Sequence, residues 1–142
     1  MTIFIDADGC PVVDITIEMA RARGVECVIV CDTSHVFEKA GVCTITVSKG
    51  SDSADFALVN MVKPGDIVVT QDYGLACMCL AKHAVPVDQN GRVYTDNNID
   101  ALLNERYISK KIRMAGGRFG SHPKRTQNQD KKYRDSLNSI LS

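Results

Sequence analysis

The sequence predicts an α/β protein, a three-layer α/β/α sandwich around a mostly parallel sheet of four or five strands. Apolar runs of strand length alternate along the chain with segments of helical periodicity, which is the order typical of this class. Residues 26–31 are almost continuously apolar, as expected for a strand that is buried on both faces of a parallel sheet. Beyond about residue 100 the chain becomes basic and helical, so the sandwich would carry a basic C-terminal helical extension.

The predicted elements follow from the apolar runs and from the residues that interrupt them. Expected strands span residues 2–6, 26–31, 42–47, 66–70 and 85–87, and expected helices span residues 12–23, 52–62, 73–82, 99–107 and 129–141. Pro11 suits the start of the first helix, and Gly24 ends it. Pro64 and Gly65 end the second helix, and Asn90-Gly91 predicts a turn after the short fifth strand.

The last predicted helix is amphipathic. Its apolar face consists of Tyr133, Leu137, Ile140 and Leu141. Because a helix with one apolar face normally buries that face, we expect this helix to dock on the body of the protein.

The chain of 142 residues is long enough for one domain with a substantial core and too short for two. We divide this single domain, residues 1–142, into an α/β body (residues 1–100) and a basic helical tail (residues 101–142) that packs on it. The body holds 7 lysines and arginines against 14 aspartates and glutamates, whereas the tail holds 10 against 3. This asymmetry suggests an acid-lined site and a separate surface for anions such as nucleic-acid phosphates. The alternative is that the basic tail merely packs on the acidic body.

The composition indicates a cytoplasmic protein. No stretch approaches the roughly 20 apolar residues of a membrane span, so no membrane partner is expected. The chain begins directly with a strand and shows no basic-then-apolar leader that would mark it for export. None of the six cysteines forms a C-x-x-C pair and most lie in apolar runs, so we interpret them as reduced core residues.

Aspartates follow three of the predicted strands. They are Asp6 with Asp8, Asp52 with Asp55, and Asp72. Because the loops that follow parallel strands leave the sheet at one edge, we expect these carboxylates to gather there. Several carboxylates repel one another unless a cation joins them, and Mg²⁺ and Mn²⁺ prefer such oxygen ligands. The pattern therefore predicts a catalytic site in which these five residues bind one or two Mg²⁺ or Mn²⁺ ions.

Each of these aspartates also has a purely structural interpretation. Asp52 and Asp72 suit helix N-caps, Asp55 suits the first turn of a helix, and Asp8-Gly9 suits a turn. The position of Asp6 directly at a strand end, where no cap is needed, favours the shared site. Three further aspartates lack this placement, and we interpret them as surface or turn residues. They are Asp14, Asp32 and Asp66.

The basic tail contains the candidate phosphate contacts. These are Arg118, His122, Lys124 and Arg125, in a segment punctuated by glycine and proline. Cations of this kind bind the nucleic-acid backbone without reading its sequence. They make RNA or another nucleic acid the expected partner. The sequence does not determine the oligomeric state, and a homodimer is one of the open alternatives.

Several segments together resemble the YaiI/YqxD family of uncharacterised bacterial proteins. They are Asp6-Ala7-Asp8-Gly9-Cys10-Pro11-Val12, Gly50-Ser51-Asp52-Ser53-Ala54-Asp55, Pro64-Gly65-Asp66-Ile67-Val68-Val69-Thr70-Gln71-Asp72, Gly116-Gly117-Arg118 and His122-Pro123-Lys124-Arg125-Thr126. The resemblance runs nearly from end to end of the chain. Family members usually have alanine where this chain has Gly9, a difference that loosens a turn and removes no ligand.

The resemblance implies a PIN-like domain, a fold whose active members are Mg²⁺- or Mn²⁺-dependent ribonucleases with acids at the carboxyl edge of the sheet. By position, Asp6 would match the acid after the first strand, Asp52 or Asp55 the acid that opens a later helix, and Asp72 the acid after the fourth strand. The resulting hypothesis is a metal-dependent nuclease that hydrolyses phosphodiesters, with RNA as the expected substrate.

Two other functions remain open from the sequence. A strand ending in Asp6-x-Asp8 is also the opening signature of haloacid-dehalogenase-type phosphatases, in which Asp6 would be the nucleophile and Asp8 the general acid/base. Cys10, which stands where that superfamily has threonine, and the short chain argue against this alternative. The third interpretation is a non-catalytic module that binds nucleic acid or protein through its basic tail.

Overall fold

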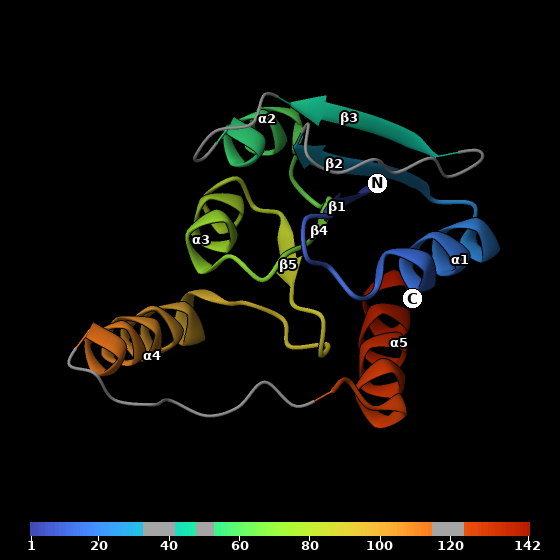
Figure 1. Ribbon diagram of the computed structural model, residues 1–142. Helices are drawn as coiled ribbons and strands as arrows, with labels where there is room; N and C mark the ends of the chain where they lie inside the picture. Colours follow the sequence, from blue (N-terminus) through green and yellow to red (C-terminus); the bar gives the residue numbers. More distant parts are fainter. Residues whose placement is uncertain (33–41, 48–52, 115–123) are drawn as a thin grey trace.

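One parallel sheet of five strands forms the centre of the molecule (Figure 1). The computed structural model describes residues 1–32, 42–47, 53–114 and 124–142. The strands are β1 (Thr2–Asp6), β2 (Glu26–Asp32), β3 (Cys43–Val47), β4 (Ile67–Val69) and β5 (Val85–Val87). Their order across the sheet is β3-β2-β1-β4-β5, and every neighbouring pair is parallel. The α/β class and the strand arrangement predicted from the sequence are confirmed.

The strand order contains one reversal, beside β1. The chain first moves outward on one side of β1, to β2 and β3, and then crosses to the other side to add β4 and β5. The loops that leave the carboxyl ends of β1 and β4 therefore separate at the reversal. In open α/β sheets this position is where ligands bind.

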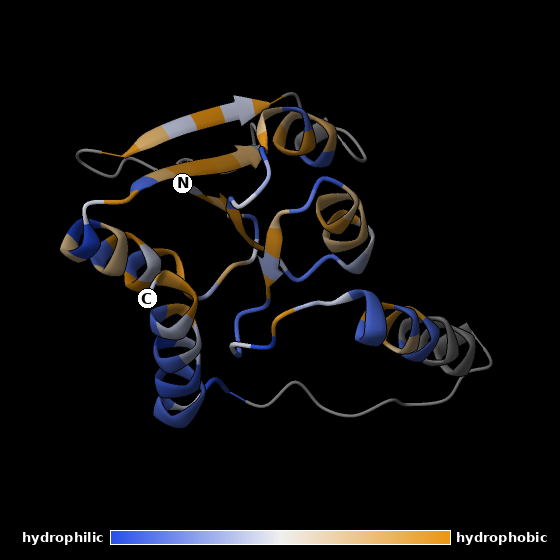
Figure 2. Ribbon diagram, turned by 180° about the vertical axis from the view of Figure 1, so that it is seen from behind, coloured by the Kyte–Doolittle hydropathy of each residue, from blue (hydrophilic) through white to orange (hydrophobic). Residues whose placement is uncertain are grey.

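Alternate residues of the buried strands face two different layers of helices. Ile3 and Ile5 of β1 belong to a core that also includes Leu137 of α5, whereas Phe4 belongs to a core that includes Leu58 of α2. The helices α1 (Val13–Arg23) and α5 (Gln127–Leu141) lie on the first face, and α2 (Ser53–Met61) and α3 (Tyr73–Ala81) lie on the second (Figure 1). Apolar residues dominate the strands between these layers, and α5 is mostly polar on its outside (Figure 2).

Helix α4 (Asp96–Met114) packs outside α3 rather than on the sheet. It starts three residues before the predicted helix, because Asn98 and Thr95 exchange side-chain and backbone hydrogen bonds at its beginning. Helix α5 likewise starts two residues early. Thr126 caps it through a reciprocal pair of hydrogen bonds with Gln129, a capping box that the sequence analysis missed.

Helix α5 docks on α1, as its apolar face predicted. The Tyr133 hydroxyl and Thr16 Oγ1 share a buried hydrogen bond of 2.6 Å, and Thr16 Oγ1 also donates to the carbonyl of Val12. Leu137 is fully buried against the same core. At the far end of the contact, the Arg23 guanidinium donates to Asn138 Oδ1. The C-terminal helix is therefore part of the hydrophobic core.

Two interpretations of the sequence need correction in detail. Asp66 ends a turn, as interpreted, because its backbone N–H donates to the carbonyl of Lys63 at 3.1 Å, but it is buried rather than on the surface. Its carboxylate accepts hydrogen bonds from the backbone N–H groups of Thr2 (3.0 Å) and Lys63 (2.9 Å), which ties together the amino ends of β1 and β4. Cys43 and Cys77 are exposed, so not all six cysteines are core residues, although Cys27, Cys31 and Cys79 are buried. All six thiols are free.

In the part of the chain that the structure describes, no helix is both long enough and apolar enough to cross a lipid bilayer.

Candidate functional site

Asp6 and Asp72 lie on either side of the reversal in strand order, and Thr70 links them. Asp6 is the last residue of β1, and Thr70 directly follows β4 on the neighbouring strand. The Thr70 hydroxyl donates to Asp6 Oδ2 at 2.8 Å and accepts from the backbone N–H of Asp72 at 3.0 Å. One buried hydroxyl therefore fixes the Asp6 carboxylate and the backbone of Asp72 relative to each other.

The structural interpretation of Asp72 as an N-cap is confirmed. Its Oδ1 accepts from the backbone N–H of Leu75 at 3.1 Å, at the start of α3. Capping uses one carboxylate oxygen and holds the side chain at the carboxyl edge of the sheet. The capping role and a role in a shared site are therefore compatible.

The electrostatics of Asp6 indicate a crowded acidic site. Burial raises the pKa of Asp6 above its ordinary value of 3.8, and the Thr70 hydrogen bond partly opposes this shift. The carboxylates of Asp72 and Asp8 each add a smaller upward contribution to the pKa. Asp8 and Asp72 thus each lie close enough to Asp6 to disfavour its charged form, as predicted for one edge of the sheet. We refer to these three residues as the acid cluster.

This shift predicts how stability depends on pH. Between the unfolded and folded pKa values of Asp6, the folded chain binds a proton that the unfolded chain has released, so stability falls as pH rises. The Asp6→Asn variant lacks this titration. We expect the stability of the wild type relative to Asp6→Asn to decrease from below pH 3.8 upward and to level off above the folded pKa, as measured by urea unfolding. A difference that does not change with pH would contradict the shift.

The structure describes only one acid of the second predicted pair, Asp52 and Asp55. Asp52 lies outside the described residues, and Asp55 lies partly buried in the first turn of α2. Burial raises the pKa of Cys79 to about 12, Lys82 opposes this, and Asp55 and Asp6 both add to it. The thiol of Cys79 is therefore influenced by carboxylates from both α2 and β1.

The donor set of the acid cluster is compatible with Mg²⁺ or Mn²⁺. Among the described residues, no three His, Cys, Asp or Glu side chains are grouped closely enough to hold one ion between them. Mg²⁺ does not require such a group, because it usually keeps several waters and binds through one or two carboxylates together with substrate phosphates. Asp6 and Asp72 provide two carboxylates of this kind, Asp6 at the end of β1 and Asp72 in the loop after the adjacent strand β4.

Two cavities are lined by residues that neighbour the acid cluster in the chain. The larger is about 510 Å³ and the smaller about 290 Å³, and Gln71, Gln89 and Asn90 line both. Gln71 stands between Thr70 and Asp72 in the chain, and its Nε2 donates to the carbonyl of Gly9 at 2.9 Å. This hydrogen bond joins the loop after β4 to the loop after β1. Both cavity linings therefore include Gln71, the residue that precedes Asp72 of the acid cluster in the chain.

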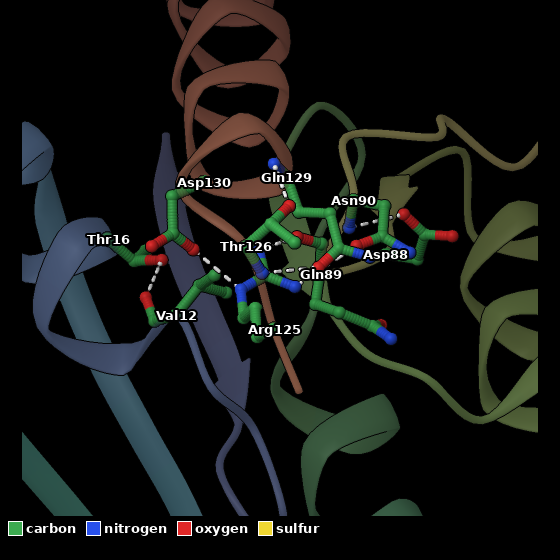
Figure 3. Close-up of polar contacts among 9 residues, drawn as sticks. All are labelled: Val12, Thr16, Asp88, Gln89, Asn90, Arg125, Thr126, Gln129 and Asp130. Carbon is green, nitrogen blue, oxygen red and sulfur yellow. Dashed lines mark hydrogen bonds and ion pairs between the residues drawn. The ribbon is translucent and has the colours of Figure 1, made fainter. Parts of the chain in front are cut away.

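Arg125, a predicted phosphate contact, forms an ion pair and hydrogen bonds with other residues of the chain (Figure 3). Its guanidinium forms an ion pair with Asp130 on α5 and donates to Asn90 Oδ1 and to the carbonyl of Gln89. Arg125 thus fastens the start of α5 to the loop after β5 and lines the smaller cavity. Lys124, its neighbour, is exposed, whereas Arg118 and His122 lie outside the described residues.

Gly91 is the point of closest approach between this loop and α5. It has a φ of +85°, and a Cβ atom there would lie 2.7 Å from the carbonyl oxygen of Lys132 and 2.9 Å from Ser136 Cβ. The Ser136 hydroxyl donates to the Gly91 carbonyl at 2.6 Å. Helix α5 therefore contacts the loop backbone directly.

We expect Gly91→Ala to destabilise the protein by about 1–3 kcal/mol, because it adds a steric clash to an unfavourable φ. The matched control is Gly65→Ala, since Gly65 has nearly the same φ, +86°, and no atom within 4 Å of its Cβ position. Urea unfolding of both variants separates the clash from the backbone strain. Equal losses in the two variants would show that α5 can shift away from the loop without cost.

The residues that organise the site around Asp6 and Asp72 were not predicted from the sequence. Thr70 and Gln71 are polar residues that directly follow the apolar strand β4, and this change in polarity was the available signal. Tyr73, Arg92 and Lys132 line the larger cavity but carried no signal, because they come from three separate elements that only the folded chain brings together.

Comparison with known proteins places this chain in a family. Residues 4–142 match the family described as uncharacterized BCR, YaiI/YqxD family. A UPF0178 protein of Exiguobacterium sibiricum is 53% identical over 142 residues, which cover 100% of this chain and 97% of the relative. UPF0178 proteins of Ruminiclostridium cellulolyticum and Clostridium kluyveri are 48% and 43% identical, over 96% and 99% of this chain and 90% and 93% of their own lengths. The chain is a member of the YaiI/YqxD family.

Proposed function

We propose that this protein is a metal-dependent phosphodiesterase that cleaves RNA at the acid cluster. The observation that carries the proposal is the link through Thr70, which holds Asp6 beside Asp72 at the reversal in strand order. Carboxylates kept close together against their repulsion are suited to a cation. RNA is the expected polymer because the family resemblance implies a PIN-like ribonuclease.

The residues of the acid cluster would hold Mg²⁺ or Mn²⁺, as one or two ions. Asp6 uses Oδ2 for the Thr70 hydrogen bond and Asp72 uses Oδ1 for the α3 cap, and these bonds hold both side chains at the carboxyl edge of the sheet, where an ion would bind. Asp52 and Asp55 are the candidate additional ligands. Such an ion, when bound, lowers the pKa of a coordinated water and neutralises the charge that develops on the phosphoryl group.

The expected phosphate contacts are Arg118, His122, Lys124 and Arg125. Lys124 is exposed and directly precedes Arg125, which lines the smaller cavity. Arg125 already has three acceptors within the protein, so a bound phosphate would share its guanidinium with Asp130. Lys124 is therefore the better single target for a test of backbone binding.

The phosphatase alternative rests on the same hydrogen bond. The Thr70 hydroxyl orients the Asp6 carboxylate, as an attack of that carboxylate on phosphorus would require. A covalent phosphate on Asp6 would distinguish this mechanism from metal-assisted attack by water.

The testing experiment compares labelled RNA, single-stranded DNA and a phosphomonoester as substrates, each with Mn²⁺, Mg²⁺ or EDTA. The proteins are the wild type, the double variant Asp6→Asn/Asp8→Asn, and Asp100→Asn as a control on the exposed face of α4. We expect metal-dependent RNA cleavage that the double variant loses by about 10²-fold or more and the control retains. Cleavage by the double variant at the wild-type rate, or no cleavage with either metal, would overturn the proposal. Phosphomonoester hydrolysis with phosphate trapped on Asp6 would establish the phosphatase instead.

A further inference from the structure

We propose that the larger cavity binds one base of a single-stranded nucleic acid, with Tyr73 as its stacking surface. This inference rests on the proposed function, because it assigns the substrate class of the same site. The cavity of about 510 Å³ falls within the range of small-molecule sites and can accommodate one nucleotide. A base inside a duplex is stacked on both sides and cannot enter such a cavity, so the expected ligand is single-stranded.

Tyr73 has the position and the rigidity that base stacking requires. It directly follows Asp72, so a base against its ring places the adjoining phosphates near the acid cluster. The ring is partly buried and meets the ring of Tyr94 edge to face, with centroids 5.8 Å apart and an interplanar angle of 64°. Tyr94 is itself buried, and its hydroxyl donates to the carbonyl of Thr70 at 3.2 Å. Tyr94 thus contacts both the stacking surface and Thr70, the residue whose hydroxyl bonds Asp6.

The polar lining of the cavity suits the edge of a base. Gln71, Gln89 and Asn90 line the cavity and carry side-chain amides, which have a donor and an acceptor as the edges of nucleobases do. The amides of Gln71 and Asn90 are engaged in part, because Gln71 Nε2 donates to Gly9 and Asn90 Oδ1 accepts from Arg125. Among the described residues, Gln89 Oε1 is buried and has no hydrogen-bond partner. A buried acceptor without a donor is costly, and a base amino group would supply that donor.

The cations of the cavity suit the phosphates of the same nucleotide. Arg92 and Lys132 both line the cavity and are exposed, so they can meet an anion from solvent. Among the lining residues that the structure describes, Asp88 is the one carboxylate, and it accepts from the backbone N–H groups of Asn90 and Arg92 at 2.8 and 2.9 Å. An aromatic face, amides and two cations in one cavity are the features of sequence-tolerant single-strand binding.

The test measures binding in EDTA, so that it does not depend on cleavage. The ligands are a fluorescein-labelled five-nucleotide adenosine RNA, an abasic strand of the same length, and adenosine monophosphate. Tyr73→Leu removes the stacking surface, Tyr73→Phe retains it, and Phe56→Leu is the matched control, because Phe56 is an exposed aromatic residue outside the cavity lining. Thermal melting of each variant confirms that it is folded.

We expect Tyr73→Leu to weaken binding of the adenosine RNA about 5- to 150-fold, since stacking one base contributes about 1–3 kcal/mol. Binding of the abasic strand should not change, and Tyr73→Phe and Phe56→Leu should bind the adenosine RNA as the wild type does. An equal loss on both strands, or an equal loss with Phe56→Leu, would overturn the inference. Monophosphate binding as tight as that of the five-nucleotide RNA would show that the ligand is a free nucleotide.

A second pair of variants tests the cavity without touching Tyr73. Lys132→Gln should weaken both strands alike and reduce the salt dependence of binding by about one phosphate contact. The control Lys63→Gln, at the opposite end of the sheet, should change neither. An unchanged salt dependence in Lys132→Gln would contradict the placement of a phosphate at the cavity.

Failure of this inference is distinguishable from failure of the proposed function. Metal-dependent cleavage with no effect of Tyr73→Leu on RNA affinity would leave the phosphodiesterase and remove the base site. Base-dependent binding that Tyr73→Leu abolishes, without cleavage in any metal, would leave the base site and remove the phosphodiesterase.

Discussion

Asp6→Asn and Asp72→Asn should each melt at a higher temperature than the wild type in EDTA and should not be stabilised by Mn²⁺. Removing one charge from the acid cluster relieves a repulsion of about 1 kcal/mol, which corresponds to about 2–4 °C in a domain of this size. Asparagine also caps helices, and it still offers an oxygen to Thr70, so neither substitution removes a structural hydrogen bond. The wild type should gain about 2.7 kcal/mol when Mn²⁺ is a hundredfold above its dissociation constant.

Asp100→Asn provides the control for this pair, because Asp100 is an exposed carboxylate on α4 outside the acid cluster. It should melt as the wild type does in EDTA and should keep the full response to Mn²⁺. If Asp6→Asn and Asp72→Asn instead lose stability in EDTA and still respond to Mn²⁺, their carboxylates serve the fold alone.

Leu137→Ala should destabilise the protein by about 2–5 kcal/mol, the range for removing a large aliphatic side chain from a core. Leu137 is fully buried where α5 meets α1 and the sheet, and the cavity left by alanine would lie beneath Tyr133. Urea unfolding should show a lower midpoint with an unchanged slope. Ser139→Ala, an exposed position on the same helix, should stay within about 0.5 kcal/mol of the wild type. A small loss for Leu137→Ala would mean that α5 detaches separately from the rest of the fold.

The central strands were predictable because a strand that is buried on both faces must be apolar at almost every position. Residues 27–31 must be apolar when Cys27, Ile29 and Cys31 face one core and Val28 and Val30 face the other. The ends of helices were less predictable, because side-chain hydrogen bonds decide them. The capping box of Thr126 and Gln129 makes α5 start at Gln127 rather than at residue 129, and neither residue differs in polarity from its neighbours.

The acid cluster was predictable because strand direction alone brings Asp6 and Asp72 to one edge of the sheet. The role of Asp66 was not, since one of its two donors, the N–H of Thr2, lies 64 residues away in the chain. The cavity was unpredictable for the same reason. Lys132 reaches it only because Gly91 allows α5 to contact the loop after β5, a contact between residues about 40 positions apart.

Synthesis from the amino terminus completes the sheet well before it completes the cavities. The last strand ends at Val87, whereas the walls of the cavities include Arg125, Gln129 and Lys132. At roughly 5–20 residues per second, translation separates the two events by seconds, which is long compared with the pairing of strands already made. A growing chain can therefore present its acidic edge on the ribosome while the walls beside that edge are still absent. The cavity walls are complete only when α5 has docked on α1, where Tyr133 bonds Thr16, 117 residues away in the chain.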